Sequence, residues 1–207
     1  MLGAGALATS KKNAQRLKAW LSFLDESGFA QRPPIRATWA PRGQTPQLME
    51  AFHWKTLSGI AAVLTQPDGR RSRWLLSVHR GSIRSAQVVR FLNTLRRHRR
   101  RPVILLRDRL SAHRSRRVAQ ALQQHRRWLR IEWLPSYAPE LNPVELLWNH
   151  LDTTALANTP VENLSRLRRR IHTGTERVRH QPALTRGFLK YTGLFLAFIL
   201  TLLCKHH

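Results

Sequence analysis

Three carboxylates stand beside apolar stretches in a chain that contains few acidic residues. Asp25 and Asp108 each follow a short apolar run, and Glu145 lies three residues after Asn142, near the start of another apolar segment. The chain has 36 Lys and Arg against only 11 Asp and Glu. Carboxylates at such positions are better explained by a bound metal ion than by surface charge balance. Their oxygens suit Mg²⁺, or Mn²⁺ in its place.

A trio of this kind fits chemistry on a phosphodiester. Two divalent ions about 3.5 to 4 Å apart can activate a nucleophile and stabilise the leaving oxygen of an in-line displacement. We expect Asp25 to bridge both ions, Asp108 to bind one and Glu145 the other. Water and then a DNA 3′-OH can act as nucleophiles, so none of the three needs to attack the substrate itself.

Each carboxylate also has a simpler explanation. Asp25 could begin a turn with Gly28, and Asp108 could form a surface ion pair with a neighbouring arginine. Asn142 is a good N-cap and would place Glu145 at the third helical position, where a capping box prefers glutamate. One shared site accounts for all three placements, whereas the simpler explanations require three coincidences.

The composition indicates a polyanionic partner. A formal charge of +25 on 207 residues favours DNA or RNA. Composition alone would also suit a ribosomal or histone-like binding protein, which needs no acidic trio. Cys204 is the only cysteine, so no internal disulfide forms, and no C-x-x-C pair suggests a zinc site. Residues 1–8 lack the basic region of a signal peptide, so we expect a cytoplasmic, nucleoid-associated protein.

The order of elements follows from apolar periodicity. Period-two or continuous apolar runs predict five strands, at residues 20–24, 57–64, 74–78, 103–106 and 129–133. A Pro-Asp-Gly turn joins the second and third strands into a hairpin. Helical periodicity predicts four helices, the first capped by Ser85, the second around residues 118–125, and the others starting at Pro143 and near Pro160.

This order predicts an α/β fold, a mixed five-stranded sheet flanked by helices. The first strand ends at Asp25 and the fourth ends just before Asp108. If these two strands are neighbours, both aspartates meet at one edge of the sheet. The helix after the fifth strand can then bring Glu145 to them.

Three segments resemble motifs of bacterial insertion-sequence transposases of the mariner-like superfamily. The longest is 134–148 (LPSYAPELNPVELLW), and the others are 108–115 (DRLSAHRS) and 24–29 (LDESGF) followed by 38–43 (TWAPRG). The resemblance implies a ribonuclease-H-like DDE nuclease core that performs cut-and-paste DNA transposition. It also implies that Asp25, Asp108 and Glu145 form the metal-binding triad, with two Mg²⁺ or Mn²⁺ ions and no small-molecule cofactor.

The resemblance divides the chain into three parts. We expect an N-terminal extension at 1–17, a DDE transposase catalytic domain at 18–193 and an apolar tail at 194–207. Residues 191–204 would span only about 21 Å as a helix, less than the ~30 Å core of a bilayer, so a packed helix or frame-shifted tail is favoured over a membrane anchor. Members usually begin with helix-turn-helix domains, absent here. The family implies a homodimer on DNA, and a separate helix-turn-helix polypeptide could supply DNA recognition.

Contacts to DNA are expected from basic and aromatic side chains. Trp39 could stack on an unpaired base or belong to the core, and His113 could orient a phosphate or begin a helix. Clustered arginines could contact phosphates or simply form solvated helix faces. The candidates are Trp39, Arg42, His113, Arg114, Arg116, Arg117, Arg168, Arg169 and Arg170.

Two functions fit these observations. The first is an enzyme that cleaves DNA strands and transfers them in the transposition of an insertion sequence, and the intact acidic trio favours it. The second is a catalytically inactive transposase relic that binds nucleic acid through charge, and the missing recognition domain favours that one. A third hypothesis, a membrane-anchored basic protein, is supported only by the apolar tail.

Overall fold

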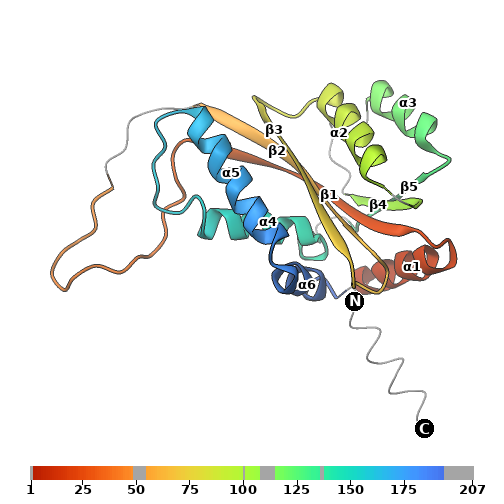
Figure 1. Cartoon of the computed structure of the whole chain (residues 1–207), viewed down its shortest axis with the longest axis horizontal. Coiled ribbons are helices and arrows are strands. Elements are labelled where there is room, and N and C mark those ends of the chain that lie inside the picture. The colour runs from red at the N-terminus through yellow and green to blue at the C-terminus, as the bar shows by residue number, and fades with distance from the viewer. Residues whose placement is uncertain (1, 49–54, 100, 108–114, 136–137, 194–207) are drawn as a thin grey trace, which may run out of the picture.

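A mixed five-stranded sheet forms the centre of the molecule (Figure 1). The computed structural model describes residues 2–48, 55–99, 101–107, 115–135 and 138–193, and the side chains from residue 7 onward. The strand order across the sheet is β3-β2-β1-β4-β5. The strands are β1 (Trp20–Ala30), β2 (Thr56–Thr65), β3 (Ser72–Arg80), β4 (Val103–Arg107) and β5 (Leu129–Trp133).

The pairing of β1 with β4 confirms that the first and fourth strands are neighbours. They run parallel, in a register that ends at Phe23 opposite Leu106. β4 and β5 are also parallel, whereas β1, β2 and β3 form an antiparallel meander. The expected hairpin between β2 and β3 is confirmed. The carboxyl ends of β1 and β4 therefore point the same way, as a shared carboxylate site requires.

One expectation about β1 is wrong. Asp25 does not end the strand, because β1 continues to Ala30. Its antiparallel register with β2 is unbroken from Leu21 opposite Thr65 to Ala30 opposite Thr56, and Asp25 pairs with Ala61. The backbone hydrogen bonds to β2 thus hold Ser27 and Gly28 in extended conformation, although both residues favour turns.

Six helices, in the part of the chain that the structure describes, cover the two faces of the sheet. They are α1 (Leu2–Arg16), α2 (Ser85–His98), α3 (Arg116–His125), α4 (Pro143–Thr153), α5 (Leu164–Arg179) and α6 (Pro182–Tyr191). Side chains of α1, α4, α5 and α6 share one core cluster with Leu21 and Phe23 of β1. Those of α2 and α3 pack on the other face, around Leu24 (Figure 1). Successive side chains of a strand point to opposite faces of the sheet, so Asp25, next to Leu24, lies on the face that α4 covers.

Two of the predicted helix boundaries are wrong. The N-cap of α2 is Arg84 rather than Ser85, and α5 begins at Leu164 after Asn163, whose side chain accepts a hydrogen bond from the Arg166 N–H. Helices α1 and α6 were not anticipated. α1 contains glycines and small residues, and it is held by packing of Leu7 into the core. Local propensity alone does not predict such a helix.

Two side chains of α1 also bind the sheet. Ser10 Oγ and Asn13 Nδ2 both donate to the carboxylate of Glu132 on β5. No helix among the described residues is long and apolar enough to cross a membrane. The apolar tail at 194–207 lies outside the described residues.

Gly174 marks a close approach between α5 and α4. A Cβ at Gly174 would lie 2.5 Å from Leu151 Cδ2 and 2.9 Å from Ala155 Cβ, whereas one at Gly187 on α6 would meet nothing within 4 Å. We expect Gly174→Ala to lower the free energy of unfolding by about 1 to 2 kcal/mol, because the clash outweighs the helix propensity of alanine. Gly187→Ala should raise it by about 0.5 to 1 kcal/mol. Urea unfolding measures both, and equal effects would contradict the close packing.

Candidate active site

Asp25 is a buried carboxylate in the middle of β1. Its relative exposure is 6%, and Oδ2 accepts a hydrogen bond of 2.8 Å from Nε1 of Trp148 on α4. The Trp148 ring is itself buried and packs edge-on against Phe29 of β1, with 5.6 Å between ring centroids. A buried carboxylate needs such a donor, since burial without one is costly. The indole therefore fixes the direction of one Asp25 oxygen.

Asn142 joins the start of α4 to the same part of β1. Its Oδ1 accepts from the Val144 N–H at 3.2 Å, which confirms it as the N-cap of α4. Its Nδ2 donates to the carbonyl oxygen of Leu24 at 3.4 Å. The first turn and a half of α4 is thus attached to β1 at two points, Leu24 through Asn142 and Asp25 through Trp148. Glu145 lies between these two anchors in the helix.

Glu145 has an exposed side chain on the first turn of α4. The simpler explanation, a capping box, would use the backbone N–H of Asn142. That N–H donates to the Pro139 oxygen at 2.9 Å, within a short 3-10 helix, η2 (Pro139–Leu141). The Glu145 N–H in turn donates to the Asn142 oxygen at 3.1 Å. The cap is therefore complete without the Glu145 carboxylate.

The end of β4 is fixed by a buried arginine. Arg107 is 1% exposed, its guanidinium stacks over the Trp133 ring at 4.8 Å from the centroid, and its carbonyl accepts from the Leu134 N–H at 2.9 Å. Asp108 follows Arg107 in the sequence and lies outside the described residues, as do His113 and Arg114. Among the described residues, Glu145 thus lies three positions before Trp148, whose indole binds Asp25.

The donor chemistry suits a divalent cation. Within the described ranges, no three His, Cys, Asp or Glu side chains form a metal-binding group. Asp25 and Glu145 supply carboxylate oxygens, the ligands that Mg²⁺ and Mn²⁺ prefer. Asp108, which belongs to the expected ligand set, is not among those ranges. The residue types of Asp25 and Glu145 suit such an ion.

The long segment that follows β1 carries two of the candidate DNA contacts. Trp39 is 100% exposed, so it is not a core residue, and Arg42 is also exposed. Figure 1 shows this segment, in orange, looping away from the body. Its base is held by Asn158, which donates from Nδ2 to the Arg36 oxygen and accepts at Oδ1 from the Arg36 N–H, both at 2.8 Å. Its first residue, Gln31, donates to the Val161 oxygen at 3.2 Å.

The remaining candidate arginines lie at the surface of α3 and α5. Arg116, Arg117, Arg168 and Arg169 are exposed. Arg170 is half-buried and donates from Nη1 to the Ala155 oxygen at 3.0 Å, so it contributes to the packing of α5 on the loop after α4.

Burial shifts the pKa values of three titratable groups, two on α4 and one on β3. It lowers the pKa of His150 on α4 and raises that of Asp152, which Arg36 partly offsets. It also lowers the pKa of His79 on β3, with smaller contributions from Arg90 and Arg168. Both shifts favour the uncharged imidazole.

Sequence reasoning missed two residues of this site. Trp148 was assigned only to the apolar side of its helix, and Asn142 only to the cap. Their contacts with Asp25 and Leu24 join residues more than a hundred positions apart. The only sequence signal was their position inside the 134–148 motif.

The sheet order β3-β2-β1-β4-β5, with helices on both faces, defines the class, a ribonuclease-H-like domain. The family model described as DDE superfamily endonuclease matches residues 20–168, from β1 into α5, and the chain belongs to this family. That range contains Asp25, Asp108 and Glu145.

Solved structures share this fold. The Mos1 mariner paired-end complex with Mn matches with a TM-score of 0.59 and 17% identity, over 93% of this chain and 59% of that chain. The Mos1 paired-end complex with Mg matches with a TM-score of 0.59 and 17% identity, over 94% of this chain and 60% of that chain. The Mos1 strand transfer complex matches with a TM-score of 0.56 and 16% identity, over 92% of this chain and 57% of that chain. This chain therefore spans about three fifths of the length of these chains. No curated protein matches it.

Proposed function

We propose that this chain carries out metal-dependent DNA cleavage and strand transfer in cut-and-paste transposition of an insertion sequence. Asp25, Asp108 and Glu145 are the proposed catalytic and metal-binding residues. The observation that carries the proposal is the attachment of the Glu145 turn of α4 to the Leu24–Asp25 segment of β1. Membership in the DDE endonuclease family supports it.

Two divalent ions, Mg²⁺ or Mn²⁺, would be held by the three carboxylates. When bound, they would activate the nucleophile and stabilise the leaving oxygen of the phosphodiester. The protein's own part is positioning. Trp148 fixes Oδ2 of Asp25, and the burial of Asp25 on the α4 face of the sheet limits the access of water.

DNA is the proposed substrate. The formal charge of +25 supports it. So do the Mos1 structures with the same fold, one of which is a paired-end complex with the left transposon end. We propose that Trp39 and Arg42 on the segment after β1, with Arg116, Arg117, Arg168 and Arg169, contact this DNA in a nucleoid-associated protein. Outside the described residues, His113 and Arg114 are proposed contacts.

We also propose that two copies act together, because two element ends must be paired. A separate helix-turn-helix polypeptide would supply recognition of the element ends. This arrangement is tested by the mass of the complex formed on a DNA end.

Nicking of supercoiled plasmid tests the proposed chemistry. The purified chain should nick plasmid with Mn²⁺ or Mg²⁺ and not with EDTA. Asp108→Ala and Glu145→Gln should each lower the rate by at least a hundredfold, since each removes a ligand oxygen charge needed in the transition state.

The alternative is a relic that binds DNA without cleaving it. Plasmid binding that is equal in the three proteins, with no metal-dependent nicking in any of them, would establish that alternative. Melting temperatures of the variants serve as the control for folding.

A further inference from the structure

A basic site lies at the edge of the sheet where β1 and β4 begin. A cavity of about 720 Å³ opens between the β2–β3 turn, the starts of β1 and β4, and the corner between α5 and α6. We call it the basic hollow. Seven arginines line it: Arg70, Arg71, Arg73, Arg99, Arg101, Arg179 and Arg186.

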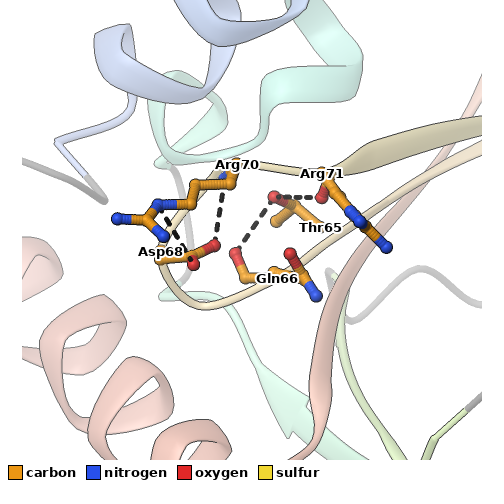
Figure 2. A network of polar contacts seen from close by, with 5 residues as sticks. All are labelled: Thr65, Gln66, Asp68, Arg70 and Arg71. Carbon is orange, nitrogen blue, oxygen red and sulfur yellow. Dashed lines mark hydrogen bonds and ion pairs between the residues drawn. The ribbon is translucent and has the colours of Figure 1, made fainter.

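The β2–β3 turn holds its arginines in a defined place (Figure 2). The Gln66 N–H donates to the Arg71 oxygen at 3.0 Å, and Thr65 Oγ1 donates to the Gln66 oxygen at 3.1 Å. The Arg70 N–H donates to Asp68 Oδ1 at 3.0 Å. In Figure 2, Asp68 lies beside the Arg70 side chain, whereas the Arg71 side chain points away from it. These hydrogen bonds hold the backbone of the β2–β3 turn in place, and with it the backbone of Arg71.

The opposite wall is also fixed. Trp74 Nε1 on β3 donates to Thr185 Oγ1 of α6 at 2.9 Å, and Thr185 Oγ1 lies 3.4 Å from the Val178 oxygen of α5, to which it donates. These bonds attach the α5–α6 corner to the sheet. Arg179 and Arg186 stand on either side of that corner.

Positive charge in the basic hollow exceeds negative charge. His98 also lines it, and no carboxylate does so among the residues the structure describes. Two carboxylates pair with its arginines, Asp68 with Arg70 and Glu176 with Arg179. Arg71, Arg101 and Arg186 form no ion pair with a described carboxylate. Arginine's planar fork binds phosphate oxygens in pairs, so this hollow suits a phosphate-rich ligand.

The basic hollow is remote from the proposed cleavage site. Trp20, the first residue of β1, lines it. Asp25 lies five residues further along the strand, which corresponds to about 17 Å. A ligand in the hollow therefore does not occupy the position of the cleaved bond.

We propose that the basic hollow binds the sugar–phosphate backbone of duplex DNA away from the cleaved phosphodiester. This inference depends on the proposed function in one respect, that DNA is the substrate. Clustered, uncompensated arginines that converge from three chain segments are what backbone contact requires, and such contact carries no base information. The site thus adds affinity and orientation to the binding of DNA by this domain.

Salt-dependent binding tests the proposal. The full chain and a triple variant, Arg71→Gln, Arg101→Gln and Arg186→Gln, are titrated onto a 30-base-pair duplex in EDTA and followed by fluorescence anisotropy. Each lost phosphate contact should lower the slope of log affinity against log salt by about 0.9. We expect the triple variant to lose two to three contacts and at least tenfold in affinity at low salt.

A matched variant removes the same charge elsewhere. Lys12, Arg16 and Arg177 are exposed and do not line the hollow. Replacing these three with glutamine should change the affinity less than threefold. Equal affinities and slopes for the two triple variants would overturn the proposal and leave only a general charge effect.

Two further measurements separate this proposal from the nuclease proposal. The nicking rate of the hollow variant at saturating DNA should equal that of the parent chain, and a hundredfold loss there would overturn the placement away from the cleaved bond. Because binding is measured in EDTA, absence of nicking in the parent chain leaves the binding test valid. Replacement of the three arginines by lysine should keep the salt slope and weaken binding severalfold, which also checks that the variants fold.

Discussion

Replacing Asp25 with Asn is expected to reduce metal-dependent nicking of plasmid about a thousandfold. The substitution keeps the shape of a buried side chain that is 6% exposed, but it removes the negative charge that a divalent ion requires. A bound divalent ion stabilises the transition state by several kcal/mol, and loss of that stabilisation corresponds to a rate change of this size. Single-turnover nicking in Mn²⁺, with DNA binding measured in parallel, gives the result.

The neighbouring Glu26 provides the control. It lies one position further along β1 in an unbroken register, so its side chain points to the opposite face of the sheet. Glu26→Gln should leave the nicking rate within about twofold. If the two variants nicked DNA equally well, Asp25 would be a structural carboxylate and the proposed triad would be wrong.

Trp148→Phe is expected to lower the nicking rate by about ten- to a hundredfold. The phenyl ring retains the packing against Phe29, whereas the 2.8 Å bond from the indole to Asp25 is lost. A hydrogen bond to a charged group contributes about 1.5 to 3 kcal/mol. Trp148→Ala would in addition cost about 3 to 5 kcal/mol of stability, because it opens a cavity in the core.

The effect of Trp148 on activity can be separated from its effect on stability. Trp128 is also buried, and its Nε1 has no hydrogen-bond partner in the described part of the chain. Trp128→Phe therefore removes similar volume and no bond to a carboxylate, and it should leave nicking unchanged. A positioning role further predicts that Trp148→Phe raises the Mn²⁺ concentration needed for half-maximal nicking.

The pair can be tested for coupling. In the Asp25→Asn background, adding Trp148→Phe should cost little further activity, because the bond no longer orients a metal ligand. Multiplicative losses in the double variant would show that Trp148 acts through packing alone.

Local pattern was sufficient to predict much of this protein. Alternation and short apolar runs located all five strands, and helical periodicity located α2, α3 and α4. Asn142 at the N-cap and the tight turn between β2 and β3 depend on neighbouring residues, and both were predicted correctly. The motif around Glu145 led to the family that the domain match confirms.

Other features depend on partners far along the chain. β1 runs beyond Asp25 because β2 supplies backbone hydrogen bonds as far as Ala30, and the turn-favouring Ser27 and Gly28 give no sign of this. Helix α1 is held by contacts of Ser10 and Asn13 with Glu132, more than a hundred residues away.

The sequence alone determined which residues are candidates for chemistry, because carboxylates and arginines are identified by type and spacing. The tertiary structure decided how they are supported. It attached Trp148 to Asp25 and Asn142 to Leu24, and it gathered arginines from separate elements into the basic hollow. The physical reason is that these contacts form only when the chain folds, since burial and strand pairing bring together residues that local propensity treats as independent.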